Sequence, residues 1–156
     1  MRQSRYNQSI MKQLCMLLAL LLLVPFNAIA AEDHELVGLW LTKKRDAAVR
    51  IVSCQGELCG YISWLSNDED QFSVSGKPLC QVQVLSGFKP DKKQSNTWTS
   101  GKVYKADDEK TYSGKITLIS DDTVQLRAYL GIPALGKTKT LTRTSEKLHP
   151  PCKIPS

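Results

Sequence analysis

Four cysteines follow the N-terminal segment of this 156-residue chain, and their thiols are its most evident source of chemistry. They are Cys54, Cys59, Cys80 and Cys152. Four thiolates could bind zinc, but the spacings lack the paired C-x-x-C elements of such sites. An even number of cysteines in an exported domain is typical of disulfides, and four cysteines allow three pairings. The sequence therefore predicts two disulfides rather than a zinc site.

Histidine offers little for catalysis here. The chain holds two histidines, His34 and His149, and both lie outside the predicted strands. A Ser-His-Asp triad needs a histidine that the framework holds in place. We therefore expect no catalytic residue and no cofactor, with an uncharacterised hydrolase as the alternative.

The acidic residues cluster in predicted turns, where solvated charge is the simplest interpretation. The clusters are at 68–70, 107–109 and 121–122. A calcium site would have to come from Asp68 and Asp70, yet their loop lacks the Gly-centred twelve-residue pattern. A glycosidase needs two carboxylates that face one cleft, which these positions do not suggest. The sequence predicts no metal site.

The first 30 residues have the organisation of a Sec-type signal peptide. An apolar run spans 14–26, and a small-residue cleavage site, Ala28-Ile29-Ala30, follows it. Basic residues precede the run: Arg2, Arg5 and Lys12. Cys15 lies at the start of the run instead of after it, which argues against a lipid anchor. We expect residues 1–30 to be cleaved on export, with an uncleaved N-terminal anchor as the alternative.

Charge argues against nucleic acid as a partner. The formal net charge of the whole chain is +6. The predicted signal peptide holds three basic residues and no acidic one, so half of that charge leaves with it. The remaining basicity is too small to predict a nucleic-acid surface. Cleavage also leaves no stable membrane span.

Residues 31–143 read as one β-domain. Short runs rich in β-branched and aromatic residues alternate with turn signals, and no run shows a convincing 3.6-residue period. We expect an all-β, up-and-down antiparallel barrel of about eight strands, because closure removes exposed strand edges. A β-sandwich is the alternative, and the proline-containing tail at 144–156 should be irregular. The expected strands are 36–42, 49–54, 60–65, a weak edge strand at 79–85, 97–104, 111–119, 124–130 and 136–143.

The hairpin at 49–65 makes a specific prediction. Two period-2 runs flank Gln55-Gly56-Glu57-Leu58, with Cys54 before and Cys59 after. Directly opposed residues in a hairpin have Cα atoms about 4.5–5.5 Å apart, and disulfides need roughly 4.4–6.8 Å. This geometry favours a bridge between the two, which leaves the other two cysteines to pair. That second bridge would tie the tail to the body.

Gly38-x-Trp40 opens the first expected strand, and Arg143 ends the last one. First and last strands are neighbours in an up-and-down barrel, so Trp40 can lie under Arg143. A cation–π contact of this kind contributes roughly 0.5–2 kcal/mol. The arrangement resembles the structural signature of lipocalins and their relatives. It predicts barrel closure by these two residues rather than a ligand contact.

A longer series of motifs resembles the bacterial domain of unknown function 2147 family over nearly the whole of residues 31–156. The motifs are Gly38-Leu39-Trp40, Val49-Arg50-Ile51, Cys54…Leu58-Cys59-Gly60-Tyr61-Ile62, Gly76-Lys77-Pro78-Leu79-Cys80, Leu85-Ser86-Gly87-Phe88, Trp98-Thr99-Ser100-Gly101-Lys102-Val103-Tyr104, Lys110-Thr111-Tyr112 and Gly131-Ile132-Pro133-Ala134-Leu135-Gly136. The resemblance implies an exported lipocalin-like barrel in a Gram-negative periplasm, without established catalytic residues. Leu141 departs from a frequent Trp, Glu109 from a frequent turn Gly, and Cys152 lies beyond the usual end.

An eight-stranded barrel has room for packed side chains or for one small ligand. Strand aromatics, a strand arginine and the exposed-looking apolar loop at 131–136 are the candidate ligand contacts, although core packing is the simpler role for each aromatic. The candidates are Tyr61, Trp64, Trp98, Tyr112, Arg127, Tyr129, Ile132 and Leu135.

Two functions follow from these observations. The first is non-enzymatic binding of a small, partly apolar ligand in an internal cavity that opens at one end. The second is an interaction module with a solid barrel, whose loops dock on envelope proteins. A filled interior would argue against the first.

Overall fold

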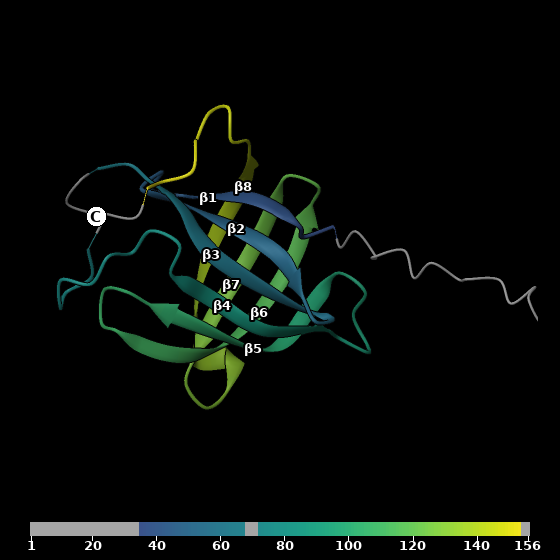
Figure 1. Cartoon of the computed structure of the whole chain (residues 1–156). Helices are drawn as coiled ribbons and strands as arrows, with labels where there is room; N and C mark the ends of the chain where they lie inside the picture. Colours follow the sequence, from purple (N-terminus) through teal and green to yellow (C-terminus); the bar gives the residue numbers. More distant parts are fainter. Residues whose placement is uncertain (1–34, 68–71, 154–156) are drawn as a thin grey trace, which may run out of the picture. The chain divides into compact units, whose positions relative to one another are not determined.

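The computed structural model describes residues 35–67 and 72–153, which form eight β-strands and one 3₁₀ turn (Figure 1). The predicted all-β class is confirmed. The elements are β1 Gly38–Thr42, β2 Ala47–Cys54, β3 Glu57–Leu65, β4 Gln83–Pro90, β5 Thr97–Lys105, β6 Lys110–Ser120, β7 Thr123–Tyr129, η2 Pro133–Leu135 and β8 Lys137–Thr144. The predicted signal peptide, His34 and the Asp68–Asp70 pair lie outside the described residues.

The strands close into an antiparallel barrel in chain order, and β1 pairs with β8 to complete it. Figure 1 shows β1 to β3 crossing in front of β6 to β8. Because each strand reverses direction, the connections alternate between two ends. We call the end with the β1–β2, β3–β4, β5–β6 and β7–β8 connections the distal end. The other end, which Trp40 and Arg143 close, is the closed end.

Alternate residues of all eight strands point inward and form one core, as the period of two in a strand requires. Figure 1 shows the strands that enclose it. Its buried members are Leu36, Trp40, Val49, Ile51, Leu58, Leu85, Phe88, Trp98, Val103, Ile116, Leu118, Val124 and Leu141.

Phe88 points into the barrel and has no exposed surface. Its ring lies so close to Gly101 and Gly114 that a Cβ on either glycine would stand 2.4 and 2.5 Å from ring atoms. The two glycines are cross-strand partners on β5 and β6, and their lack of a Cβ makes room for the Phe88 ring. Buried side chains from all eight strands thus pack inside the barrel, and the predicted internal cavity stays a prediction.

The prediction failed at β4. It placed an edge strand at 79–85 and a loop at 86–96, whereas the strand is Gln83–Pro90 and pairs on both sides. Gly87 and Pro90 suggested a loop, but Gly87 takes a positive φ of 70° within the strand and Pro90 ends it. Leu79 and Cys80 are buried outside any strand, because the second disulfide holds this segment against the barrel.

The turn between β2 and β3 is also shorter than predicted. Cys54 pairs with Glu57 in the ladder, so Gln55 and Gly56 alone make the turn. Both have positive φ, 53° and 84°, as a two-residue type I′ turn requires. The two cysteines consequently lie diagonally rather than directly opposed, with Cα atoms 5.9 Å apart.

A second, smaller cluster lies on the outer wall. Leu39, Leu41 and Ala48 point away from the interior and pack with Trp64. The C-terminal tail, residues 145–153, adds His149 to this cluster. Its ring packs edge-on against the Trp64 ring, with the two ring centroids 4.4 Å apart. The tail is thus an irregular strap over the outside of β1 to β3, and Figure 1 shows it crossing from β8 toward that wall.

Candidate functional site

Trp40 and Arg143 are cross-strand partners on β1 and β8. The Arg143 guanidinium carbon lies 4.2 Å from the centre of the Trp40 ring, and the indole N–H donates to the Leu36 carbonyl at 2.8 Å. The guanidinium also donates to three backbone carbonyls, those of Glu35, Val37 and Asp121. Through these bonds Arg143 connects the segment that precedes β1 with the β6–β7 turn. The pair seals the closed end.

Gly38 makes that seal possible. Its φ of +144° favours glycine, and a Cβ there would stand 2.7 Å from the Arg143 side chain. Glycine at position 38 therefore leaves the space that the Arg143 side chain needs beside Trp40. The predicted role of Trp40 and Arg143 in barrel closure is consistent with this packing.

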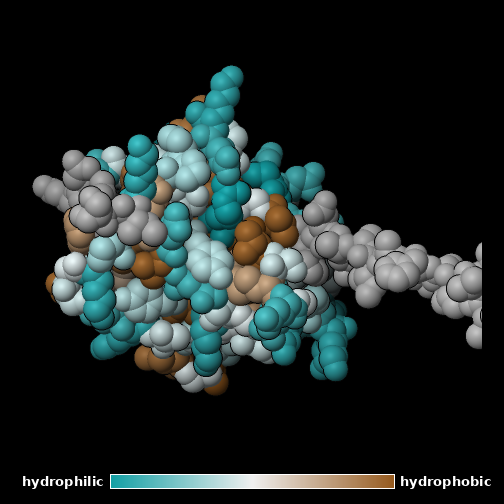
Figure 2. Space-filling model, viewed as in Figure 1, coloured by the Kyte–Doolittle hydropathy of each residue, from teal (hydrophilic) through white to brown (hydrophobic). Residues whose placement is uncertain are grey.

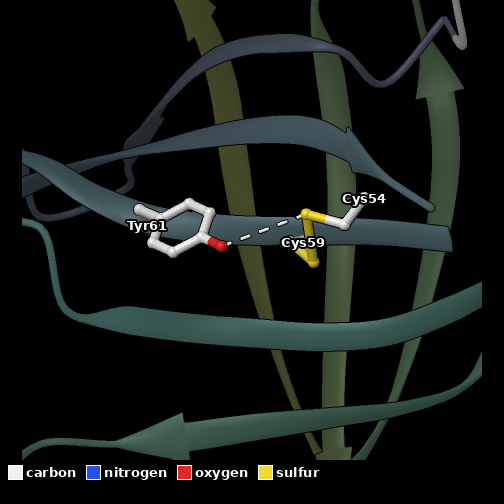
Figure 3. Close-up of a disulfide and its surroundings, with 3 residues drawn as sticks. All are labelled: Cys54, Cys59 and Tyr61. Atoms are coloured by element: carbon white, nitrogen blue, oxygen red, sulfur yellow. Dashed lines mark hydrogen bonds between the residues drawn. A yellow bond between two sulfur atoms is a disulfide. The ribbon is translucent and has the colours of Figure 1, made fainter.

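The two disulfides join Cys54 to Cys59 and Cys80 to Cys152. The first lies on the outer wall, where the Tyr61 hydroxyl approaches Cys54 Sγ at 4.0 Å (Figure 3). The second joins the β3–β4 connection to the tail. The backbone N–H of Cys152 also donates to the Ser63 carbonyl at 2.7 Å, which fixes the strap on β3.

The candidate ligand residues do not form one site. Trp98 lies in the core with 5% of its surface exposed. Tyr61 and Trp64 are on the outer wall of β3, and Trp64 is half-buried beneath the strap. The remaining five belong to strands and connections near the distal end: Tyr112, Arg127, Tyr129, Ile132 and Leu135.

Tyr112 takes part in a local polar cluster at the β5–β6 hairpin. Its hydroxyl donates to Asp108 at 2.7 Å, and Lys105 pairs with the same carboxylate at 3.1 Å. The hydrogen bond from Tyr112, aided by Lys105, lowers the pKa of Asp108, and the bond to Asp108 raises the pKa of Tyr112. The bond to Asp108 likewise raises the pKa of Lys105. The tyrosine hydroxyl is thus engaged within the hairpin.

Glu109 joins this hairpin to the β3–β4 connection. Its carboxylate accepts hydrogen bonds from the hydroxyls of Ser73 at 2.6 Å and Ser75 at 2.5 Å. These bonds lower the pKa of Glu109. Glu109 also has a positive φ of 52°, a conformation that glycine adopts more easily. The glutamate side chain thus gains contacts at this turn that a glycine would lack.

Arg127 holds the β7–β8 connection in place. Its guanidinium donates to the carbonyls of Pro133 at 2.6 Å and Ala134 at 3.0 Å, and to the Thr138 hydroxyl at 2.7 Å. Three of its five N–H donors are therefore used within the protein. The predicted ligand contact of Arg127 stays a prediction.

Exposed apolar side chains project from the loop that Arg127 holds. Leu130, Ile132 and Leu135 are 65%, 57% and 78% exposed. Leu130 was expected within the preceding strand, but β7 ends at Tyr129. Figure 2 shows apolar surface at the lower edge of the molecule, where η2 lies in Figure 1. We call Leu130, Ile132 and Leu135 the apolar loop. Phe72 and Val74, in the β3–β4 connection, are exposed at the same end of the barrel.

Two clefts lie on the outside of the barrel. The first, about 490 Å³, lies between the outer wall of β1 and β8 and the strap. The second, about 350 Å³, borders Arg50, Tyr61 and the Cys152 end of the strap. Sequence reasoning missed both clefts, because the packing of the strap depends on long-range contacts. Among the described residues, no cluster of three or more potential ligands could hold a metal ion. No described helix is long and apolar enough to cross a membrane.

The model of the family described as "Uncharacterized protein conserved in bacteria (DUF2147)" matches residues 38–143, from the first residue of β1 to Arg143. The chain belongs to the DUF2147 family. Its match covers the complete barrel and confirms the resemblance that the motifs predicted. The strap lies beyond the matched region. No curated protein matches the chain.

A solved structure supports the lipocalin-like assignment of the DUF2147 barrel. It is described as "Protein HP1028 from the human pathogen Helicobacter pylori belongs to the lipocalin family". The TM-score is 0.58 at 21% identity, with 72% of this chain and 85% of that chain covered. At this identity the likeness concerns the fold.

Proposed function

We propose that this protein is an exported, non-enzymatic interaction module that acts through the outside of a solid barrel. Its partner would be a protein of the bacterial envelope, and the apolar loop would be the main contact. The observation that carries the proposal is the Arg127 network, which holds exposed Ile132 and Leu135 in a fixed arrangement. A preorganised apolar surface loses little conformational entropy on binding.

The filled interior supports the same proposal. Phe88 is fully buried inside the barrel over the paired Gly101 and Gly114, so a ligand at this point would have to displace its ring. Loss of such a ring from a core costs about 3–5 kcal/mol. A small ligand is therefore better placed on the outer wall than within the barrel.

Export is part of the proposal. The N-terminal segment has the pattern of a cleaved signal peptide, and the two disulfides suit an oxidising compartment. In a Gram-negative bacterium this compartment would be the periplasm. N-terminal sequencing of the exported protein should begin at Ala31, and a retained segment 1–30 would contradict cleavage.

Site-specific photo-crosslinking in intact cells tests the docking proposal. A photoreactive residue at Ile132 or Leu135 should yield a discrete protein adduct. Ile119 is the matched control, because it is 54% exposed but lies near the β6–β7 turn at the closed end. Equal adducts from Ile119 and Ile132, or none from either loop position, would overturn the proposal.

A small, partly apolar ligand is the second candidate function. The first cleft favours it, because its volume of about 490 Å³ falls within the roughly 300–1,000 Å³ of small-molecule sites. That site lies on the outer wall, and no residue of the apolar loop lines it.

A further inference from the structure

We propose that the first cleft binds a small amphipathic anion, with its head group between Lys43 and Arg45 and its apolar part against Leu41 and Leu148. This site is independent of the apolar loop and goes beyond the docking function.

The wall of the cleft follows from strand register. Trp40 and Leu141 point into the core, so their neighbours Leu41, Thr140 and Thr142 point outward. Leu41 pairs with Thr142 across β1 and β8. The cleft therefore has hydroxyl groups from β8 beside an apolar side chain from β1. Hydroxyls can donate to an anion while the leucine contacts a hydrocarbon.

The charge of the lining is one-sided. Lys43, Arg45, Arg143 and His149 line the cleft, and no aspartate or glutamate does. Arg143 is engaged with carbonyls and Trp40, which leaves the two cations of the β1–β2 turn as the head-group site. The carboxylate of that turn, Asp46, accepts a hydrogen bond from Thr42 and is not part of the lining.

In the part of the chain that the structure describes, Lys43 and Arg45 are free of carboxylate partners, unlike Arg50, which pairs with Glu146, and Lys89, which pairs with Glu57 at 2.9 Å. Within residues 35–67 and 72–153, neither Lys43 nor Arg45 makes an ion pair. Two unpaired cations beside hydroxyl groups favour a carboxylate, sulfate or phosphate head group.

The strap supplies the opposite wall. Leu148 and His149 line the cleft from the tail, and His149 Nδ1 lies 2.8 Å from the Thr144 hydroxyl oxygen. The Cys80–Cys152 bridge and the Trp64–His149 contact hold this segment in place. Leu148 is 70% exposed, so an apolar ligand chain would cover a side chain that water now surrounds. The site thus needs the disulfide for its shape.

Decanoate below its micelle concentration is a suitable probe, and decanol is its neutral counterpart. Calorimetric titration of the full exported chain should show saturable decanoate binding and markedly weaker decanol binding. Lys43→Gln combined with Arg45→Gln should weaken decanoate binding about tenfold, because two charge-assisted contacts are lost. Lys92→Gln, an exposed lysine in the β4–β5 connection, is the charge control and should bind as the parent does.

Arg45→Gly separates binding from folding. Arg45 has a positive φ of 61°, which glycine adopts without strain, so this variant should unfold at the same or a higher temperature. It should nevertheless bind decanoate several-fold more weakly. Leu148→Ser should also weaken binding, whereas Leu135→Ser in the apolar loop should not.

Three results would overturn the inference. One is equal binding of decanoate and decanol, and another is an unchanged affinity in Arg45→Gly. The third is binding to anionic phospholipid vesicles without any binding of monomeric decanoate, which would identify a membrane surface as the ligand. Retained photo-crosslinking at Ile132 in Arg45→Gly would show that docking is unaffected, so the two proposals can fail separately.

Discussion

Single side chains decide whether this barrel has room inside. Phe88 is the clearest case, because a Cβ on Gly101 would stand 2.4 Å from its ring. We expect Gly101→Ala to destabilise the protein by about 1–3 kcal/mol, the usual cost of overpacking a core. Denaturant unfolding would measure it.

The same experiment contains its own control. Phe88→Leu shortens the side chain that a Cβ at position 101 would meet. Adding Gly101→Ala to Phe88→Leu should therefore cost less stability than adding it to the parent protein. A Gly101→Ala variant as stable as the parent would show that the ring is free to move, and would return an internal cavity to consideration.

Glu109 makes a prediction about pH at the residue scale. Its pKa is lowered by hydrogen bonds from Ser73 and Ser75, so its carboxylate favours the closed hairpin contact above the unfolded pKa of about 4.3. That contribution is lost as pH falls through the lowered pKa. The Ser75 N–H faces the same carboxylate oxygen at 3.4 Å, so its protection factor, the intrinsic exchange rate at each pH divided by the observed rate, should fall under acid.

Two variants separate the charge of Glu109 from its backbone. Glu109→Gln should show fast Ser75 exchange at neutral pH as well. Glu109→Gly should lose the protection too, while its unfolding temperature stays level or rises because glycine suits the positive φ. Acid-independent protection at Ser75 would contradict the assigned contact.

At the scale of elements, the strap depends on the longer disulfide. Cys80–Cys152 closes a separation of 72 residues, whereas Cys54–Cys59 closes 5. The chain-entropy model assigns about 4 kcal/mol to the first and about 2 kcal/mol to the second. We expect Cys80→Ser with Cys152→Ser to cost more stability than Cys54→Ser with Cys59→Ser.

Non-reducing peptide mapping and amide exchange check this order. Mapping should find Cys54 and Cys59 in one bridged fragment, and Cys59 joined to Cys80 would refute the pairing. In the Cys80/Cys152 variant the Cys152-to-Ser63 backbone bond should lose protection while β5 to β7 keep theirs. Equal loss across all strands would mean that the strap and the barrel unfold as one unit.

The strands show what sequence could predict. Period-2 alternation located β6 correctly, because Gly114, Ile116 and Leu118 all face the core. It failed at β4, because Gly87 lies within the strand and Pro90 ends it, whereas both residues predicted a loop. The local sequence pattern cannot distinguish a glycine or proline in a strand from one in a loop here, because the residues that pair with β4 lie on β3 and β5.

The candidate site was less predictable than the fold. Residue type singled out Trp98 and Arg127, yet one is core and the other holds the η2 turn. Lys43 and Arg45 gave no local signal, because their neighbours in the cleft come from β8 and the strap. Such a site depends on contacts between distant parts of the chain, which single-sequence patterns do not reveal.

For the whole molecule, the central claim is a solid barrel that acts from its outside. Native mass spectrometry of protein purified from the periplasm tests it most directly. We predict a complex with a protein partner that Ile132→Ser with Leu135→Ser abolishes and Ile119→Ser preserves. A small molecule that copurifies without any protein, and is retained by the apolar-loop and Arg45→Gly variants alike, would place the ligand outside both proposed sites and contradict the account.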